Sequence, residues 1–360
     1  MEMDLKVPGN VLYLESNSLK TVDLDTKETH LIAGKADTRG YREGIGEEAR
    51  FHAPFSFYQM NGSEVVILDA ENRCIRKVSR LTNETSILAG WCTVPGDQDG
   101  SFSTANFGHP EKVVEISPNK LAFTDSTNFC IRELDFDQEK TSTLLRLDIL
   151  LFGLTLRPHT RELYFSFVGG FGSLNLDDLK YTMHTQTSHH GYRDGGLSED
   201  AVFAVRPETL VFITNNIMLV SGFNTHLIRV VNFLAETVSS ICDPAPKGNF
   251  TRSGDIETCV LSNPRSLLAI PTRNKVLIGS HESIGFMGLY GLPDTILAPT
   301  TPSTTVPTTS TSAITTSTSS GTAITDGTTG IRTGISTYEN QSKIALMIDC
   351  CCFAFFESNL

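Results

Sequence analysis

The chain has 360 residues, a formal net charge of −12 and a pI near 5.2. Its length allows one large domain or two ordinary ones, and its acidic balance argues against a nucleic-acid partner, which would require a basic surface to gather phosphates. Charged residues make up only 19% of the sequence, below the roughly 25% that is usual for a globular domain. Some part of the chain must therefore be poor in charge.

The N-terminal segment is acidic. Glu2 and Asp4 stand where a signal peptide needs a basic patch followed by an apolar run, so no secretory signal is visible in the sequence. Residues 11–34 carry only the later part of a repeat that is clearer further along the chain.

A repeat with a constant shift of 56 residues relates residues 40–76 to residues 96–132. About ten identities stay in register without a gap, namely Gly40/Gly96, Gly44/Gly100, Ala49/Ala105, Phe51/Phe107, Pro54/Pro110, Asp69/Asp125, Asn72/Asn128, Cys74/Cys130, Ile75/Ile131 and Arg76/Arg132. A looser copy begins at Gly191, fainter ones occupy residues 149–187 and begin at Gly254, and together they predict six units of about 50 residues.

Each unit is predicted to form four short strands. In the second unit, β-branched and aromatic runs predict strands at 55–58, 65–68, 74–78 and 85–89, separated by turn residues such as Asn61-Gly62. A four-stranded sheet that is apolar on both faces needs a neighbour on each side, and a closed ring of such sheets provides both. We therefore predict an all-β fold, a six-bladed β-propeller over residues 1–298, followed by a disordered tail.

The repeated residues also match a known pattern. Gly-x2-(Asp/Glu)-Gly, then Ala-x-Phe-x2-Pro, a strand ending in Asp, Asn-x-Cys-Ile-Arg and a strand ending in Ala-Gly together resemble the NHL repeat, clearly in residues 40–90 and 96–145 and partly in 191–241. The resemblance implies a β-propeller, usually with six blades. It implies little about function, because the same scaffold carries ligand-binding, RNA-binding and enzymatic members.

The polar residues of the repeat are predicted to be structural. A short carboxylate at the end of a strand accepts backbone N–H groups of the following turn, and an arginine after a buried isoleucine is expected to pair with a carboxylate of the adjoining blade. These predictions cover Asp69, Asn72, Arg76, Asp125, Asn128 and Arg132.

A contact surface is predicted at two matching loops. Tyr41-Arg42 and Tyr192-Arg193 occupy equivalent positions, and tyrosine and arginine often anchor interfaces. The alternative is that all four are solvated loop residues.

The histidines and potential nucleophiles do not form a recognisable catalytic or metal motif. His52 and His109 belong to the repeat, which favours turn or packing roles, and His184, His189 and His190 lie in a polar interblade loop. The sequence has no Gly-x-Ser-x-Gly elbow. We predict no catalytic, cofactor-binding or metal-ligating residues and no cofactor.

Glycosylation and disulfide candidates are also present. Asn-x-Ser/Thr acceptors stand at four positions, Asn61, Asn83, Asn249 and Asn340. Cys242 and Cys259 flank a loop that a disulfide would close, whereas Cys74 and Cys130, at equivalent places in neighbouring units, are predicted to be buried thiols or packing residues.

The C-terminal part accounts for the shortage of charge. Between Thr300 and Thr337, 23 of the 38 residues are Ser or Thr, which predicts a disordered mucin-like stalk over residues 299–342. Residues 343–360 form a short, apolar, Cys-rich terminus, interpreted either as a truncated membrane anchor with acylation sites or as a frayed end.

These features together predict a non-catalytic module that binds a protein or glycan ligand, is displayed extracellularly or at the cell surface, and acts as a monomer with possible membrane anchoring through its C-terminus. One alternative is a metal-dependent hydrolase or lyase of the propeller type. A second alternative is an intracellular protein-interaction scaffold.

Overall fold

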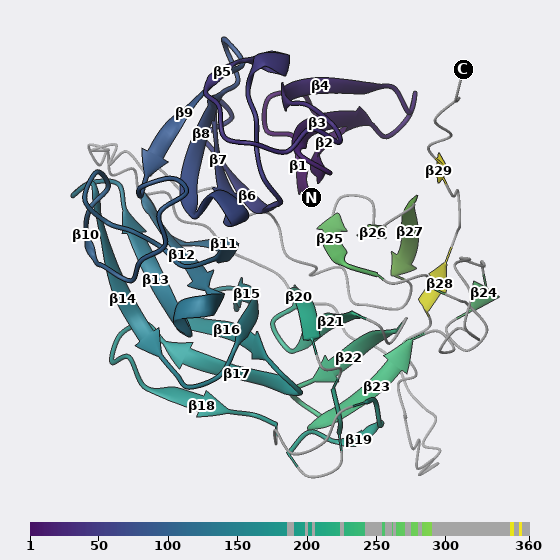
Figure 1. Ribbon diagram of the computed structural model, residues 1–360. Coiled ribbons are helices and arrows are strands. Elements are labelled where there is room, and N and C mark those ends of the chain that lie inside the picture. The colour runs from purple at the N-terminus through teal and green to yellow at the C-terminus, as the bar shows by residue number, and fades with distance from the viewer. Residues whose placement is uncertain are drawn as a thin grey trace, which may run out of the picture.

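The computed structural model describes residues 1–185, 191–198, 201–203, 206–223, 227–241, 254–255, 261, 264–270, 275–279, 283–289, 346–348 and 353–354. Within these ranges the regular segments are antiparallel strands, apart from three short 3-10 turns, η1 (Gly46–Glu48), η2 (Ala70–Asn72) and η3 (Ser126–Asn128). The sheets stand around a central axis, so the all-β propeller predicted from the repeat is the observed fold (Figure 1).

Five sheets, built from β1 to β23, are complete blades. The first consists of β1 (Glu2–Met3), β2 (Asn10–Glu15), β3 (Ser18–Asp23) and β4 (Thr29–Gly34). The second consists of β5 (Gly44–Ile45), β6 (Pro54–Met60), β7 (Glu64–Asp69), β8 (Cys74–Ser79) and β9 (Glu84–Ala89). The third consists of β10 (Gly100–Ser101), β11 (Pro110–Ser117), β12 (Lys120–Asp125), β13 (Cys130–Asp135) and β14 (Lys140–Arg146).

The fourth blade consists of β15 (Leu151–Leu156), β16 (Glu162–Phe167), β17 (Gly170–Asn175) and β18 (Tyr181–Met183). The fifth consists of β19 (Gly195–Gly196), β20 (Arg206–Thr214), β21 (Ile217–Phe223), β22 (Ile228–Asn232) and β23 (Thr237–Ile241). In the second, third and fifth blades the short strands β5, β10 and β19 pair with the outermost long strand.

A further sheet closes the circle between the fifth blade and the first. It contains β24 (Gly254–Asp255), β25 (Ser266–Ile270), β26 (Lys275–Gly279), β27 (Ser283–Leu289), β28 (Leu346–Ile348) and β29 (Phe353–Ala354). Strands β28 and β29 both pair with β27, so the outer part of this sheet comes from beyond residue 298.

The prediction of six blades within residues 1–298 is therefore wrong, since the structure has five complete blades there. The physical reason lies in the last copy of the repeat, which keeps only Gly254, Leu261 and Pro264 and carries no signal for its outer strand.

The second blade shows how the sequence determines the local structure. The four strands predicted there correspond to β6, β7, β8 and β9, each extended by one to three residues. Asn61 and Gly62 both adopt positive φ, 44° and 73°, which matches the right-handed twist of the flanking strands.

The core lies between neighbouring sheets. In the described part of the chain, hydrophobic clusters join each sheet to the next around the ring; for example, Phe107 and Phe123 lie between the second and third blades. The circle closes where Val11 and Tyr13 of the first blade pack against Ile270 and Leu277 of the last sheet. Both faces of each blade are thus shielded from water, as the propeller architecture requires.

One glycine position is essential to this packing. Gly90 directly follows β9 with φ of +87°, and an added Cβ would lie 2.6 Å from the Phe107 ring. Glycine therefore lets the phenyl ring of the next blade close against the backbone.

In the described residues, no helix is long and apolar enough to cross a membrane.

Candidate functional site

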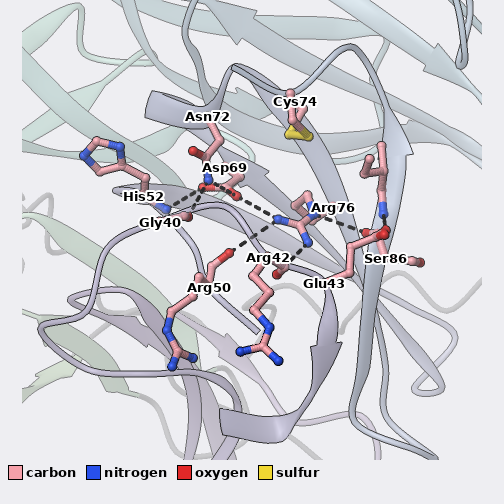
Figure 2. The surroundings of a disulfide bond; sticks show 12 residues. Gly40, Arg42, Glu43, Arg50, His52, Asp69, Asn72, Cys74, Arg76 and Ser86 are labelled. Atoms are coloured by element: carbon pink, nitrogen blue, oxygen red, sulfur yellow. Dashed lines mark hydrogen bonds and ion pairs between the residues drawn. A yellow bond between two sulfur atoms is a disulfide. The ribbon is translucent and has the colours of Figure 1, made fainter. Parts of the chain in front are cut away.

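The polar residues of the repeat form a buried network in the second blade (Figure 2). In the second blade, Asp69 accepts hydrogen bonds from the backbone N–H of His52 at 2.8 Å and from the Asn72 amide at 2.8 Å, and it pairs with Arg76 at 3.2 Å. Both side chains of the ion pair are fully buried. Burial raises the pKa of Asp69 to about 6, against the opposing effects of Asn72, the His52 N–H and Arg76.

Arg76 also stabilises the segment that leads from the first blade into the second. Its guanidinium donates to the backbone carbonyls of Arg42 at 3.1 Å and Arg50 at 3.4 Å, and Asn72 donates to the carbonyl of Gly40 at 2.8 Å. The partner of this arginine expected from the sequence was a carboxylate of the adjoining blade. The partner is instead Asp69 of the same blade, because Asp69 and Arg76 lie on the paired strands β7 and β8.

The network recurs with variations. In the third blade, Asn128 and Arg132 both donate to Asp125, and Arg132 adds an ion pair with Asp99 at 2.6 Å. In the fifth blade, Arg229 donates to the carbonyls of Val202 and Arg193. Gly222 stands there in the place of the aspartate, because it pairs with Pro207 as Asp69 pairs with Pro54.

The two predicted contact loops lie at the outer edges of the second and fifth blades, on opposite sides of the ring (Figure 1). Tyr41 and Tyr192 are about half exposed, at 43% and 48%. The carbonyls of Arg42 and Arg193 accept hydrogen bonds from the buried arginines, and the guanidinium of Arg76 lies 5.2 Å from the Tyr41 ring centre. The structure does not bring the two loops together, and each contributes to its own blade.

Cys74 is not a thiol. It forms a disulfide with Cys92, 18 residues away, at the start of the loop that leads into the third blade (Figure 2). The bond could not be predicted from the repeat, because Cys74 matches Cys130 whereas Cys92 has no counterpart in the repeat. Cys130 is free and buried, as predicted. The predicted pair Cys242 and Cys259 lies outside the described residues.

Two of the four predicted glycosylation acceptors can be located. Asn61 lies in the β6–β7 turn and is exposed, and Asn83 lies in the β8–β9 turn and is partly exposed. Both turns are at the end of the second blade opposite the start of β6. Asn249 and Asn340 lie outside the described residues.

The histidines occupy different environments. His184 stacks on Tyr164 and hydrogen-bonds Ser173 at 2.9 Å, and burial lowers its pKa. His189 and His190 lie outside the described residues. No group of three His, Cys, Asp or Glu in the described parts of the chain is arranged to hold a metal ion.

A polar cluster that the sequence analysis missed lies at one end of the central axis. In four blades the innermost strand begins with a register shift in its pairing, which marks a bulge. Bulges redirect side chains and often occur beside binding sites. The residues at these bulges, together with Arg206 at the start of β20, make up what we call the axial mouth, namely Phe55, Glu111, Phe152, Arg206 and Glu208.

Arg206 links four blades at the axial mouth. Its guanidinium pairs with Glu111 of the third blade at 3.0 Å and with Glu208 of its own strand at 3.2 Å. It also lies 5.7 Å from the ring centre of Phe55 in the second blade and 4.7 Å from that of Phe152 in the fourth. Two carboxylates and two aromatic rings thus hold one cation in a fixed position.

His109 extends this cluster toward the second blade. Its imidazole contacts Glu111 at 3.1 Å and Glu71 at 3.5 Å. Burial would lower the pKa of His109, but the two carboxylates hold it above its ordinary value. Burial would likewise raise the pKa of Glu111, yet His109, Arg206 and a hydrogen bond from Ser126 hold it below its ordinary value. Both effects favour the charged pair.

Repeated hydroxyl groups hold the inner strands in register behind the mouth. Thr124, Ser166 and Ser221 occupy the same position in β12, β16 and β21, and each accepts the backbone N–H of its own inner strand. Thr124 also donates to the Phe152 carbonyl at 3.2 Å, and Ser166 donates to the Pro207 carbonyl at 2.7 Å, so each joins its blade to the next. The mouth is therefore built on a rigid base.

The comparisons with known proteins agree with the fold. No family model matches the chain. A stretch of 142 residues, 38% of the chain, is 26% identical to "Protein SUPPRESSOR OF QUENCHING 1, chloroplastic" from Arabidopsis thaliana, and spans only 13% of that protein.

Among solved structures, auxiliary nutrient binding proteins from Bacteroides ovatus and Bacteroides thetaiotaomicron match with TM-scores of 0.57 and 0.59 and identities of 14% and 12%. The matches cover 76% and 79% of this chain and 64% and 68% of those chains. At such identities the likeness shows the propeller fold alone.

Proposed function

We propose that this protein is a non-catalytic, NHL-type propeller that binds a ligand at its axial mouth and is displayed at the cell surface. The observation that carries the proposal is the position of Arg206, held between Glu111 and Glu208 and flanked by Phe55 and Phe152. Side chains from four blades converge there on a rigid base, and convergent polar groups beside an aromatic surface are typical of binding sites.

The mouth keeps accessible surface for a ligand. Phe55 is 38% exposed, and the Arg206 side chain is 29% exposed, although the two carboxylates that hold it are almost completely buried. The solved propellers of similar fold include two auxiliary nutrient binding proteins, which supports a binding role for the scaffold.

Three features support display outside the cell. The disulfide between Cys74 and Cys92 is of a kind that persists mainly in oxidising compartments. The acceptors Asn61 and Asn83 lie in turns at the end opposite the axial mouth, so glycans there would leave the mouth open. The Ser/Thr-rich segment has the composition of a stalk that would hold the propeller away from a membrane.

The binding role is tested with the full chain, labelled and applied to an array of neutral and acidic glycans and peptides. Saturable binding to at least one class is expected. Phe55→Ala should weaken it at least fivefold, because it removes the accessible ring of the mouth. The matched control is Leu81→Ala, which removes a side chain that is 78% exposed at the opposite end. Absence of binding, or equal effects of both variants, would contradict the proposal.

Localisation needs a separate test on native material. Treatment with an N-glycosidase should reduce the mass of the protein, and alkylation without reduction should leave Cys74 and Cys92 unmodified. Unglycosylated native protein with both cysteines alkylated would point to the intracellular scaffold instead.

A further inference from the structure

Lys112 occupies an unusual position on the innermost strand of the third blade, beside Glu111 of the axial mouth. It lies within the bulge of β11, next to Glu111, and its backbone N–H is fixed by the Thr124 hydroxyl at 3.0 Å. Its ammonium donates one long hydrogen bond, to the Thr209 hydroxyl of the fifth blade at 3.5 Å. The side chain thus reaches from the third blade to the fifth.

The nearby carboxylates already pair with other groups. Glu111 is bound by Arg206, His109 and Ser126, and Glu208 is bound by Arg206 and approached by Arg265 at 4.0 Å. In the described residues, no carboxylate lies within ion-pairing distance of the Lys112 ammonium. An ammonium has three N–H donors, so two of them have no partner there.

The surroundings disfavour the charge on this lysine. Burial lowers the pKa of Lys112, and the neighbouring Arg206 and Arg265 add to the effect, while Glu208 and Glu111 oppose it. A partly buried cation without a counter-ion costs free energy that a bound anion would offset.

We infer that Lys112 binds the carboxylate of an acidic sugar that enters through the axial mouth. The carboxylate supplies the acceptor oxygens that the ammonium lacks, and the accessible face of Phe55 at the entrance suits the apolar face of a sugar ring. A second polar anchor is available in the exposed part of Arg206. This inference rests on the proposed binding function and specifies its ligand class.

The inference is tested by calorimetric titration of the full chain with glucuronate, using glucose and inorganic sulfate as comparison probes. Glucuronate should bind, and glucose should bind at least tenfold more weakly. Lys112→Met should weaken glucuronate binding at least tenfold. The matched control is Lys180→Met, whose side chain is 83% exposed on another blade, and it should leave the affinity unchanged.

A thermal measurement separates binding from folding. Methionine has nearly the length of lysine and no charge, so Lys112→Met should keep or raise the melting temperature of the free protein while losing glucuronate binding. A lower melting temperature would mean that Lys112 is structural, and would overturn the inference.

Equal affinity of the wild type and Lys112→Met, no binding of glucuronate, or binding of sulfate alone would also overturn it. If the array instead reveals a neutral glycan or a peptide whose binding depends on Phe55, the proposed function stands and only this inference fails.

Discussion

Removing the disulfide gives a sharp test of the structure. The bond joins residues 18 positions apart, from the buried start of β8 to the loop that enters the third blade. Closing a loop of this length restricts the unfolded chain and contributes about 3 kcal/mol to stability. Cys92→Ser should therefore lower the melting temperature by roughly 6–10 °C, given the entropy of unfolding of a domain of this size.

The assay is differential scanning calorimetry of the wild type and Cys92→Ser, each with and without a reductant. Reduction should lower the melting temperature of the wild type by more than that of the variant, because only the wild type loses the bond between Cys74 and Cys92. Equal melting temperatures of the oxidised wild type and the variant would refute the reasoning. So would an equal effect of reduction on both proteins.

Three further predictions concern the scaffold. Because the pKa of His109 is raised in the folded state, its contribution to stability is complete below pH 6.5 and is lost as the pH rises through the folded pKa. In chemical denaturation, the difference in the free energy of unfolding between the wild type and His109→Gln should therefore shrink above pH 6.5, and a constant difference would contradict this. Arg76→Met should lower the free energy of unfolding by about 3 kcal/mol, because it leaves the buried Asp69 unpaired. In the same urea titrations Arg229→Met should lower it clearly less, because the fifth blade lacks that aspartate, and equal losses would contradict this. Gly90→Ala should lower the free energy of unfolding by about 2 kcal/mol more than Gly46→Ala, because both glycines have positive φ but only Gly90 faces a phenyl ring. Thermal unfolding of the two variants tests this, and similar melting temperatures would disprove the close packing.

The repeat allowed the fold to be predicted because its residues act within one blade. Asp69, Asn72 and Arg76 are close in sequence and lie on two paired strands and the turn between them, so every good copy of the repeat carries the same spacing. The number of blades could not be predicted in the same way. The last sheet takes β28 from a segment far from the rest of its strands, and no local pattern encodes such a pairing.

The disulfide and the axial mouth were missed for a related reason. Cys92 stands outside the repeat, and self-comparison of the chain favours residues that recur. The mouth is built from residues on different blades, such as Phe55, Glu111 and Phe152, and they become neighbours only when the ring closes. One signal was present, since Phe55 and Glu111 each follow the repeated proline, and so does Glu208.

The residue after the repeated proline differs in role from the residues that recur in each blade. The residues that recur between blades, such as Asp69 and Asp125, serve the same structural purpose in each and have no reason to differ. The residue after the repeated proline changes from phenylalanine to glutamate between the second and third blades, although a register shift follows that proline in both blades. A ring of equivalent positions with different side chains gives an asymmetric surface on a symmetric frame. A propeller can bind a specific, asymmetric ligand on its axis only where its own symmetry is broken in this way, which favours the axial mouth over the matching Tyr-Arg loops as the binding surface.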